Sequence, residues 1–184
     1  MNIKKLFEMQ KVLDNHILRE QNLNVAPFDK RCLALVVELG ECANEEKSFK
    51  YWKVPEKRKP NVKALRNPAM MSEDQEWYNP LLDEYVDCLH FVVSLGISIG
   101  VDPEKVKPVR INWEEIPEKD LTNHILALTR KVINLNYTRS KPVWFKVYND
   151  FYTFGIMLGF TSEEIEQAYM EKNQINHERQ ESGY

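Results

Sequence analysis

The feature that most constrains the fold is a pair of carboxylate motifs, each set inside a long apolar run. The first, Glu38-Leu-Gly-Glu41, lies within RCLALVVELGECANEE, and the second, Glu84-Tyr-Val-Asp87, lies within LLDEYVDCLHFVVSLG. A spacing of three residues brings both carboxylates of a motif to one face of an α-helix, about one turn apart. Neither run shows the alternation of a half-buried strand. We therefore predict two largely buried helices, each with acidic groups on one face.

Carboxylates in apolar surroundings repel one another and lose hydration, at a cost of roughly several kcal/mol for each uncompensated charge. Divalent cations remove this cost, and oxygen ligands suit Mg²⁺ best. The alternative is that both motifs lie on solvated helix faces, as a single motif of this kind usually does. However, the neighbours one turn from Glu38 and Asp87 include Leu35, Cys42 and Phe91, and the motif occurs twice. These observations favour a metal site.

Two further carboxylates extend the acidic faces. Glu45 lies four residues after Glu41, and Asp83 lies four residues before Asp87. Each is either an accessory metal ligand or a solvated group, and we favour the solvated interpretation.

Composition limits the class of protein. The 184 residues suffice for one domain with a substantial core, and only six are glycine, which favours helices over turn-rich β architecture. The net charge of −3 is too small to indicate nucleic acid or a membrane as a partner. No apolar stretch reaches the ~18 residues of a membrane span. The three cysteines, Cys32, Cys42 and Cys88, lie in apolar runs, so we expect buried, reduced thiols in a cytoplasmic protein.

Hydrophobic periodicity predicts a single all-α domain over residues 1–184, a helical bundle. The predicted helices cover residues 2–19, 30–48, 79–99, 119–137, 142–158 and 162–177. Asp29 is the candidate N-cap of the second helix. Residues 53–78 lack periodicity and contain three prolines and a basic cluster, which indicates a long loop or insertion. The proline-containing stretch 103–118 is predicted to be a connector.

Four blocks in this order resemble the dimeric, type 2 dUTPase family, which belongs to the all-α NTP pyrophosphatase superfamily together with the MazG-type enzymes. The blocks are ELGE, FKYW at 49–52, EYVDCLHF, and a C-terminal segment with Lys, Asn, Arg and Gly-Tyr at set spacing, here 169–184. The resemblance extends from Gln10 to Tyr184, apart from 53–78 and 103–160. It implies the all-α pyrophosphatase fold, a homodimer and a nucleotide substrate.

The resemblance implies that Glu38, Glu41, Glu84 and Asp87 bind Mg²⁺, for which Mn²⁺ could substitute. Glu38 and Glu41 would take part in catalysis, and Glu41 is the candidate general base.

The C-terminal segment 170–184 is expected to bind phosphate and to order over bound nucleotide as a lid. By resemblance, Lys172, Arg179 and Tyr184 hold the phosphates. Lys172 and Arg179 are seven residues apart and so project from one helix face, where they would stabilise developing charge. Asn176 lies midway on that face and could read a base edge. The alternative is a frayed, solvated tail.

The resemblance also implies a nucleoside pocket. Phe91 would pack against the sugar where a 2′-hydroxyl would lie, and His90 would either approach the sugar or satisfy a buried carboxylate. From the aromatic block, Lys50 and Trp52 would contact the nucleotide, although a packing role for Trp52 stays open. Gln10 and Asp14 would form a polar pair near the base. At the position of Asp14, the family often has Asn.

The expected reaction is Mg²⁺-dependent hydrolysis of dUTP, and of dUDP as a further candidate substrate, with dUMP and pyrophosphate as the products from dUTP. Two alternatives stay open at this point. One is a related pyrophosphohydrolase that prefers dCTP or a damaged nucleotide. The other is a non-enzymatic helical scaffold that binds a divalent cation.

Overall fold

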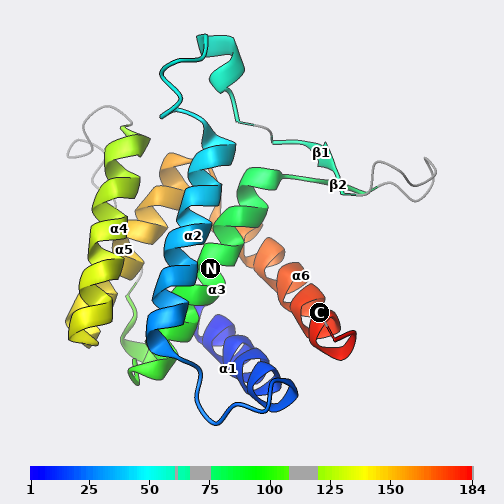
Figure 1. The fold of residues 1–184 in the computed structure, drawn as a ribbon, viewed down its shortest axis with the longest axis vertical. Helices are drawn as coiled ribbons and strands as arrows, with labels where there is room; N and C mark the ends of the chain where they lie inside the picture. The colour runs from blue at the N-terminus through cyan, green and yellow to red at the C-terminus, as the bar shows by residue number, and fades with distance from the viewer. Residues whose placement is uncertain (61, 67–75, 108–119, 184) are drawn as a thin grey trace.

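The computed structural model describes residues 1–60, 62–66, 76–107 and 120–183. Within these ranges the chain forms six α-helices and one two-stranded antiparallel sheet (Figure 1). The helices are α1 (Ile3–Glu20), α2 (Phe28–Glu46), α3 (Pro80–Ser98), α4 (Leu121–Thr138), α5 (Lys141–Met157) and α6 (Ser162–Glu181). The strands are β1 (Ala64–Leu65) and β2 (Trp77–Tyr78). The prediction of an all-α fold is therefore confirmed.

Helix α3 is the centre of the bundle, because it packs against α1, α2, α5 and α6. Helix α2 lies between α3 and α4, and α4 pairs with α5 (Figure 1). Twelve of the 19 residues of α3 are buried, as expected for a helix that is apolar on nearly all sides. Its polar side chains include Asp87, which pairs with Lys172 of α6, and His90, which bonds to Gln10 of α1.

The contact between α3 and α5 depends on two glycines. A Cβ at Gly96 would lie 2.7 Å from the ring of Trp144, and a Cβ at Gly155 would lie 2.5 Å from the hydroxyl of Tyr85. Trp144 is fully buried and donates from Nε1 to the carbonyl of Val92 at 2.8 Å. These close approaches fix α3 against the bundle and so fix the positions of the side chains on its other faces.

Local signals at the helix ends explain most of the helix boundaries. Asn79 caps α3, accepting from the amide of Leu82, and Pro80 occupies its first turn. Thr161 and Glu164 form a capping box at the start of α6. The prediction for Asp29 was wrong, because α2 begins at Phe28 and places Asp29 inside its first turn.

Helix α6 runs to Glu181, beyond the predicted end at residue 177, because its last turns contain good helix formers although they lack an apolar stripe.

The segments between the helices agree with the predicted loops where they are described. Residues 53–78 contain a 3₁₀ turn (Pro55–Arg58) and the β1–β2 ribbon, and residues 103–118 begin with a second 3₁₀ turn (Pro103–Lys105). All three cysteines are buried and have free thiols, as predicted. Among the described residues, no helix has the length and apolar character needed to cross a membrane.

Candidate active site

Three carboxylates meet where α2 packs against α3. Oxygen atoms of Glu38, Glu84 and Asp87 all lie within 4.8 Å of one another, and each side chain is partly buried. Glu41, one turn further along α2, is exposed. Its charge nevertheless acts on Glu38 and Glu84. The structure therefore brings three of the four predicted metal ligands into one cluster and leaves the fourth at its rim.

The cluster is electrostatically costly. Burial, followed by the charges of Asp87 and Glu41, raises the pKa of Glu38 from 4.5 to about 7. Burial and the same two neighbours, with Glu38, also raise the pKa of Glu84 to about 7. Glu38 and Glu84 are therefore partly protonated near neutral pH, because their charged forms are poorly hydrated and repel one another. A bound divalent cation would relieve both effects.

Lys172 supplies the nearest positive charge. Its side chain, on α6, is almost fully buried, with Nζ 2.6 Å from Asp87 and 2.9 Å from Asp83. Arg66, next to strand β1, also approaches Asp83, at 3.9 Å. Asp83 therefore pairs with two cations, so our preference for a solvated group was wrong. Lys172, which we predicted to hold the phosphates, thus contacts the cluster through Asp87.

A cleft of about 230 Å³ continues from the cluster between α1, α3 and α6. Glu38 and Asp87 line one part of it. The remainder is formed by Gln10, Leu13, Ile17, His90, Phe91, Ser94, Asn176, Arg179 and Gln180. Five residues that the sequence assigned to nucleotide binding therefore converge beside the carboxylates: Gln10, His90, Phe91, Asn176 and Arg179.

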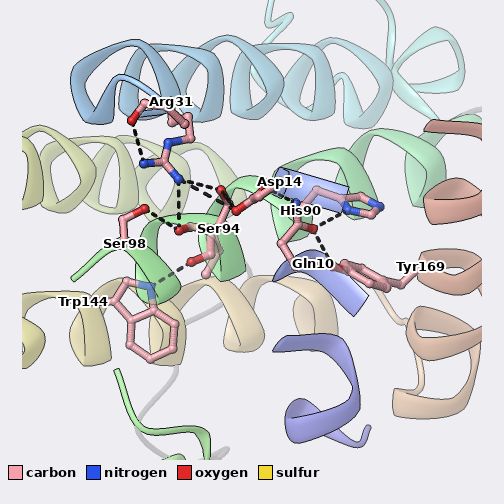
Figure 2. A network of polar contacts seen from close by, with 10 residues as sticks. Gln10, Asp14, Arg31, His90, Ser94, Ser98, Trp144 and Tyr169 are labelled. Carbon is pink, nitrogen blue, oxygen red and sulfur yellow. Dashed lines mark hydrogen bonds and ion pairs between the residues drawn. The ribbon is translucent and has the colours of Figure 1, made fainter. Parts of the chain in front are cut away.

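A buried polar network supports one wall of this cleft (Figure 2). The Gln10 side-chain oxygen is 2.7 Å from Nδ1 of His90 and accepts from the hydroxyl of Tyr169 at 2.6 Å. The Gln10 amide nitrogen donates to Asp14 at 2.7 Å. Asp14 also accepts from the hydroxyl of Ser94 at 2.7 Å. Thus Asp14, predicted to lie near the base, belongs to this network.

His90 is neutral in this setting. Its ring stacks on Tyr169 with a centroid distance of 4.0 Å and is almost fully buried. Burial, and secondarily the charge of Lys172, lowers the pKa of His90 to about 3.

Arg31 also belongs to the network, since its guanidinium lies 3.9 Å from Asp14. We did not predict Arg31, Ser94 or Tyr169 as members from the sequence. Only Ser94 carried a signal, since it lies one helical turn after His90 on the face that carries Asp87.

The comparison with protein families decides the identity of this site. The sequence model of a family described as dUTPase matches residues 2–67 and 71–184. The chain belongs to the type 2 dUTPase family. A search of curated proteins gave no match. As a dUTPase, the chain is a nucleoside triphosphate pyrophosphohydrolase, a dUTP diphosphatase, of a family that generally depends on divalent metal ions.

Neither Lys50 nor Trp52 is among the described residues that line the cleft of this dUTPase. Lys50 bonds from Nζ to the backbone and side chain of Asn44, near the end of α2. Trp52 is 62% exposed and meets Phe49 edge-on at 5.8 Å. Tyr184 lies outside the described residues. The nucleotide-binding roles of all three stay predictions.

Proposed function

We propose that this dUTPase hydrolyses dUTP to dUMP and pyrophosphate with Mg²⁺ held by Glu38, Glu84 and Asp87, and with Glu41 completing the set. The observation that carries the proposal is the meeting of three partly buried carboxylates within 4.8 Å, two of them with a pKa near 7. Such an all-oxygen donor set fits Mg²⁺, and Mn²⁺ could replace it. When bound, the ion supplies charge neutralisation and a more acidic water molecule.

Side chains of the protein would accept the proton from water and bind the phosphates. Glu41, which is exposed at the rim, would accept a proton from the attacking water. Lys172 and Arg179, both on α6, would bind the phosphates and stabilise charge that develops on them. Arg179 lines the cleft together with Asn176, which supports a path from phosphates to nucleoside along α6. Tyr184 would add a phosphate contact.

The nucleoside would occupy the 230 Å³ cleft. Phe91, partly exposed on α3, would exclude a 2′-hydroxyl, and His90 and Asn176 would contact the sugar or base. Gln10 and Asp14 would define the wall behind them. Lys50 and Trp52 would complete the pocket from the segment after α2.

A homodimer is part of the proposal. Helices α2 and α4 expose large apolar side chains: Leu33, Val37, Leu126, Ile133 and Tyr137. A second copy of the chain would cover this surface. Light scattering at micromolar concentration tests the homodimer, since a mass of 21.8 kDa would show a monomer. A cytoplasmic location likewise stays a prediction.

The function is tested by pyrophosphate release from each dNTP and NTP, with Mg²⁺ or with a chelator. We expect dUTP to be turned over fastest and the chelator to abolish turnover. Assaying dUDP by phosphate release shows whether it is also a substrate. Preference for dCTP would assign the enzyme to a relative with another base preference. Metal binding without turnover of any nucleotide would contradict the enzymatic proposal and support the scaffold interpretation.

A further inference from the structure

The side-chain amide of Gln10 lies between two unlike sets of partners. On one side is the carboxylate of Asp14, at 2.7 Å, and on the other are the Tyr169 hydroxyl and His90 Nδ1, at 2.6 and 2.7 Å (Figure 2). The oxygen and nitrogen of a glutamine amide have nearly the same shape, so the partners decide which atom faces which side.

The carboxylate of Asp14 decides the orientation of Gln10. Ser94 donates to Asp14 at 2.7 Å, and the Arg31 guanidinium lies 3.9 Å away. Burial raises the pKa of the Asp14 carboxyl, whereas the hydrogen bonds from Gln10 and Ser94 and the charge of Arg31 lower it. With donors and a cation around it, we assign Asp14 as the ionised group that only accepts. The Gln10 nitrogen must therefore face Asp14, because the reversed amide would set oxygen against oxygen at 2.7 Å. Gln10 then presents only its oxygen to His90 and Tyr169.

This orientation fixes the proton of His90. An amide oxygen can only accept, so Nδ1 of the neutral imidazole carries the hydrogen and Nε2 carries none. His90 Nε2 is buried and has no hydrogen-bond partner among the described residues. His90 also lines the 230 Å³ cleft next to Phe91. His90 thus combines a ring that lines the cleft with a buried Nε2 acceptor that has no partner among the described residues.

We propose that Asp14 is a positioning residue: through Gln10 it holds His90 in the Nδ1–H tautomer, so that Nε2 accepts a hydrogen bond from the bound nucleoside. The identity of the ligand rests on the proposed function, whereas the tautomer does not. The donor is an O–H or N–H group of the substrate. In dUTP the candidates are the 3′-hydroxyl of the sugar and the N3–H of uracil, a position at which cytosine has an acceptor instead.

Nuclear magnetic resonance of isotope-labelled histidine tests the tautomer directly. The His90 signals are assigned by their absence in His90→Gln. We expect a protonated Nδ1 and an unprotonated Nε2 in the wild type, although the free imidazole of histidine favours Nε2–H. A proton on Nε2 of the ligand-free wild type would overturn the proposal, whatever the variants show.

Three variants separate orientation from packing. Asp14→Leu keeps the shape but removes both acceptors, so the population with hydrogen on Nε2 should rise. Asp14→Asn restores an acceptor for Gln10 and should restore the tautomer. Tyr169→Phe is the matched control, because it removes a bond to the same Gln10 oxygen without affecting the amide orientation. An unchanged tautomer in folded Asp14→Leu, or an equal change in Tyr169→Phe, would overturn the proposal.

Kinetics with two dUTP analogues identify the donor. 2′,3′-Dideoxy-UTP lacks the 3′-hydroxyl, and N3-methyl-dUTP lacks the imide hydrogen. We expect the wild type to lose about tenfold or more in kcat/KM with one of them, and this loss to shrink in Asp14→Leu. Full activity on both analogues would contradict an accepting role for Nε2. Failure of the wild type to hydrolyse dUTP would instead refute the proposed function and leave the tautomer result standing.

Discussion

The two ends of the candidate active site both include side chains of α3, but they differ in how many of their polar groups have partners within the protein. At one end, Gln10, Asp14 and His90 bond to one another and to Tyr169, and burial keeps His90 neutral. At the other end, the carboxylates of α2 and α3 share one buried lysine, and burial and mutual repulsion raise the pKa of Glu38 to about 7.

Charge accounts for the difference. At the nucleoside end, Gln10 and Asp14 find their hydrogen-bond partners within the protein, and His90 Nε2 is left as an acceptor without a partner among the described residues. At the carboxylate end, burial and mutual repulsion raise the pKa of Glu38 and Glu84 even with Lys172 beside Asp87, and an added cation would relieve this cost. We therefore expect the polar network to be organised before substrate arrives and the carboxylate cluster to become organised when metal binds. The predictions below either break or sharpen this contrast.

The largest effect is expected from neutralising the carboxylates. Glu41→Gln and Asp87→Asn should each lower kcat for dUTP by roughly a hundredfold or more, a loss of about 2.7 kcal/mol, because metal or base is lost. Steady-state pyrophosphate release measures this. Glu45→Gln, on the same face of α2, is the control and should keep near-normal turnover. If Glu41→Gln or Asp87→Asn behaved like this control, that residue would not belong to the site.

The next effect concerns the C-terminal segment. Deleting residues 179–184 removes Arg179 but leaves the buried residues of α6, Ile165, Tyr169, Lys172 and Asn173, in place. We expect a folded protein whose kcat/KM for dUTP falls by about tenfold or more, since phosphate charge loses a partner. Circular dichroism and kinetics measure the two properties. Full activity of the truncated protein would refute the phosphate-binding role of this segment.

Hydrogen exchange tests whether the C-terminal segment 170–184 closes over bound nucleotide. If the segment closes over nucleotide, a non-hydrolysable dUTP analogue should increase protection across 170–184. Because α6 already extends to Glu181, the increase should be concentrated after the buried residues Lys172 and Asn173. Equal protection with and without the analogue would show that the helix is closed before substrate binds.

A moderate effect is expected on stability as a function of pH. The pKa of Glu38 is about 7 in the folded protein against 4.5 as its ordinary value, so the folded state binds the extra proton between these values. Its contribution to stability is therefore lost as pH rises through this range. Without metal, the wild type should lose stability relative to Glu38→Gln as pH rises from about 5 to 8. Urea unfolding with a chelator measures the difference, and parallel curves would contradict it.

The smallest effect is expected at Trp52. Its ring is 62% exposed, so Trp52→Ala should change the urea midpoint little. If Trp52 contacts nucleotide, KM for dUTP should rise while kcat changes little. An unchanged KM would remove Trp52 from the pocket and restrict the nucleoside end to α1, α3 and α6.

Periodicity is a local property, so the sequence predicted the helices and the acidic face of each one well. That the faces of α2 and α3 meet was inferred from the cost of buried carboxylates and from the family resemblance. It did not predict the pairing of Lys172 with Asp83, which depends on how α6 crosses α3. It likewise missed Arg31, whose role depends on long-range packing against α1 and α3. The position of Trp52 relative to the cleft also required the structure. Trp52 lies in a segment without hydrophobic periodicity, so the sequence does not indicate which way its side chain points.

The central claim is that the carboxylate end requires a divalent cation to be complete. Calorimetric titration with Mg²⁺ near pH 7, in buffers of different ionisation enthalpy, tests it most directly. We predict that the wild type binds Mg²⁺ with release of protons, because Glu38 and Glu84 are partly protonated beforehand. Glu45→Gln should bind in the same way, and Glu38→Gln should bind much more weakly. Equal Mg²⁺ binding by Glu38→Gln and the wild type, or no binding by either, would contradict the claim.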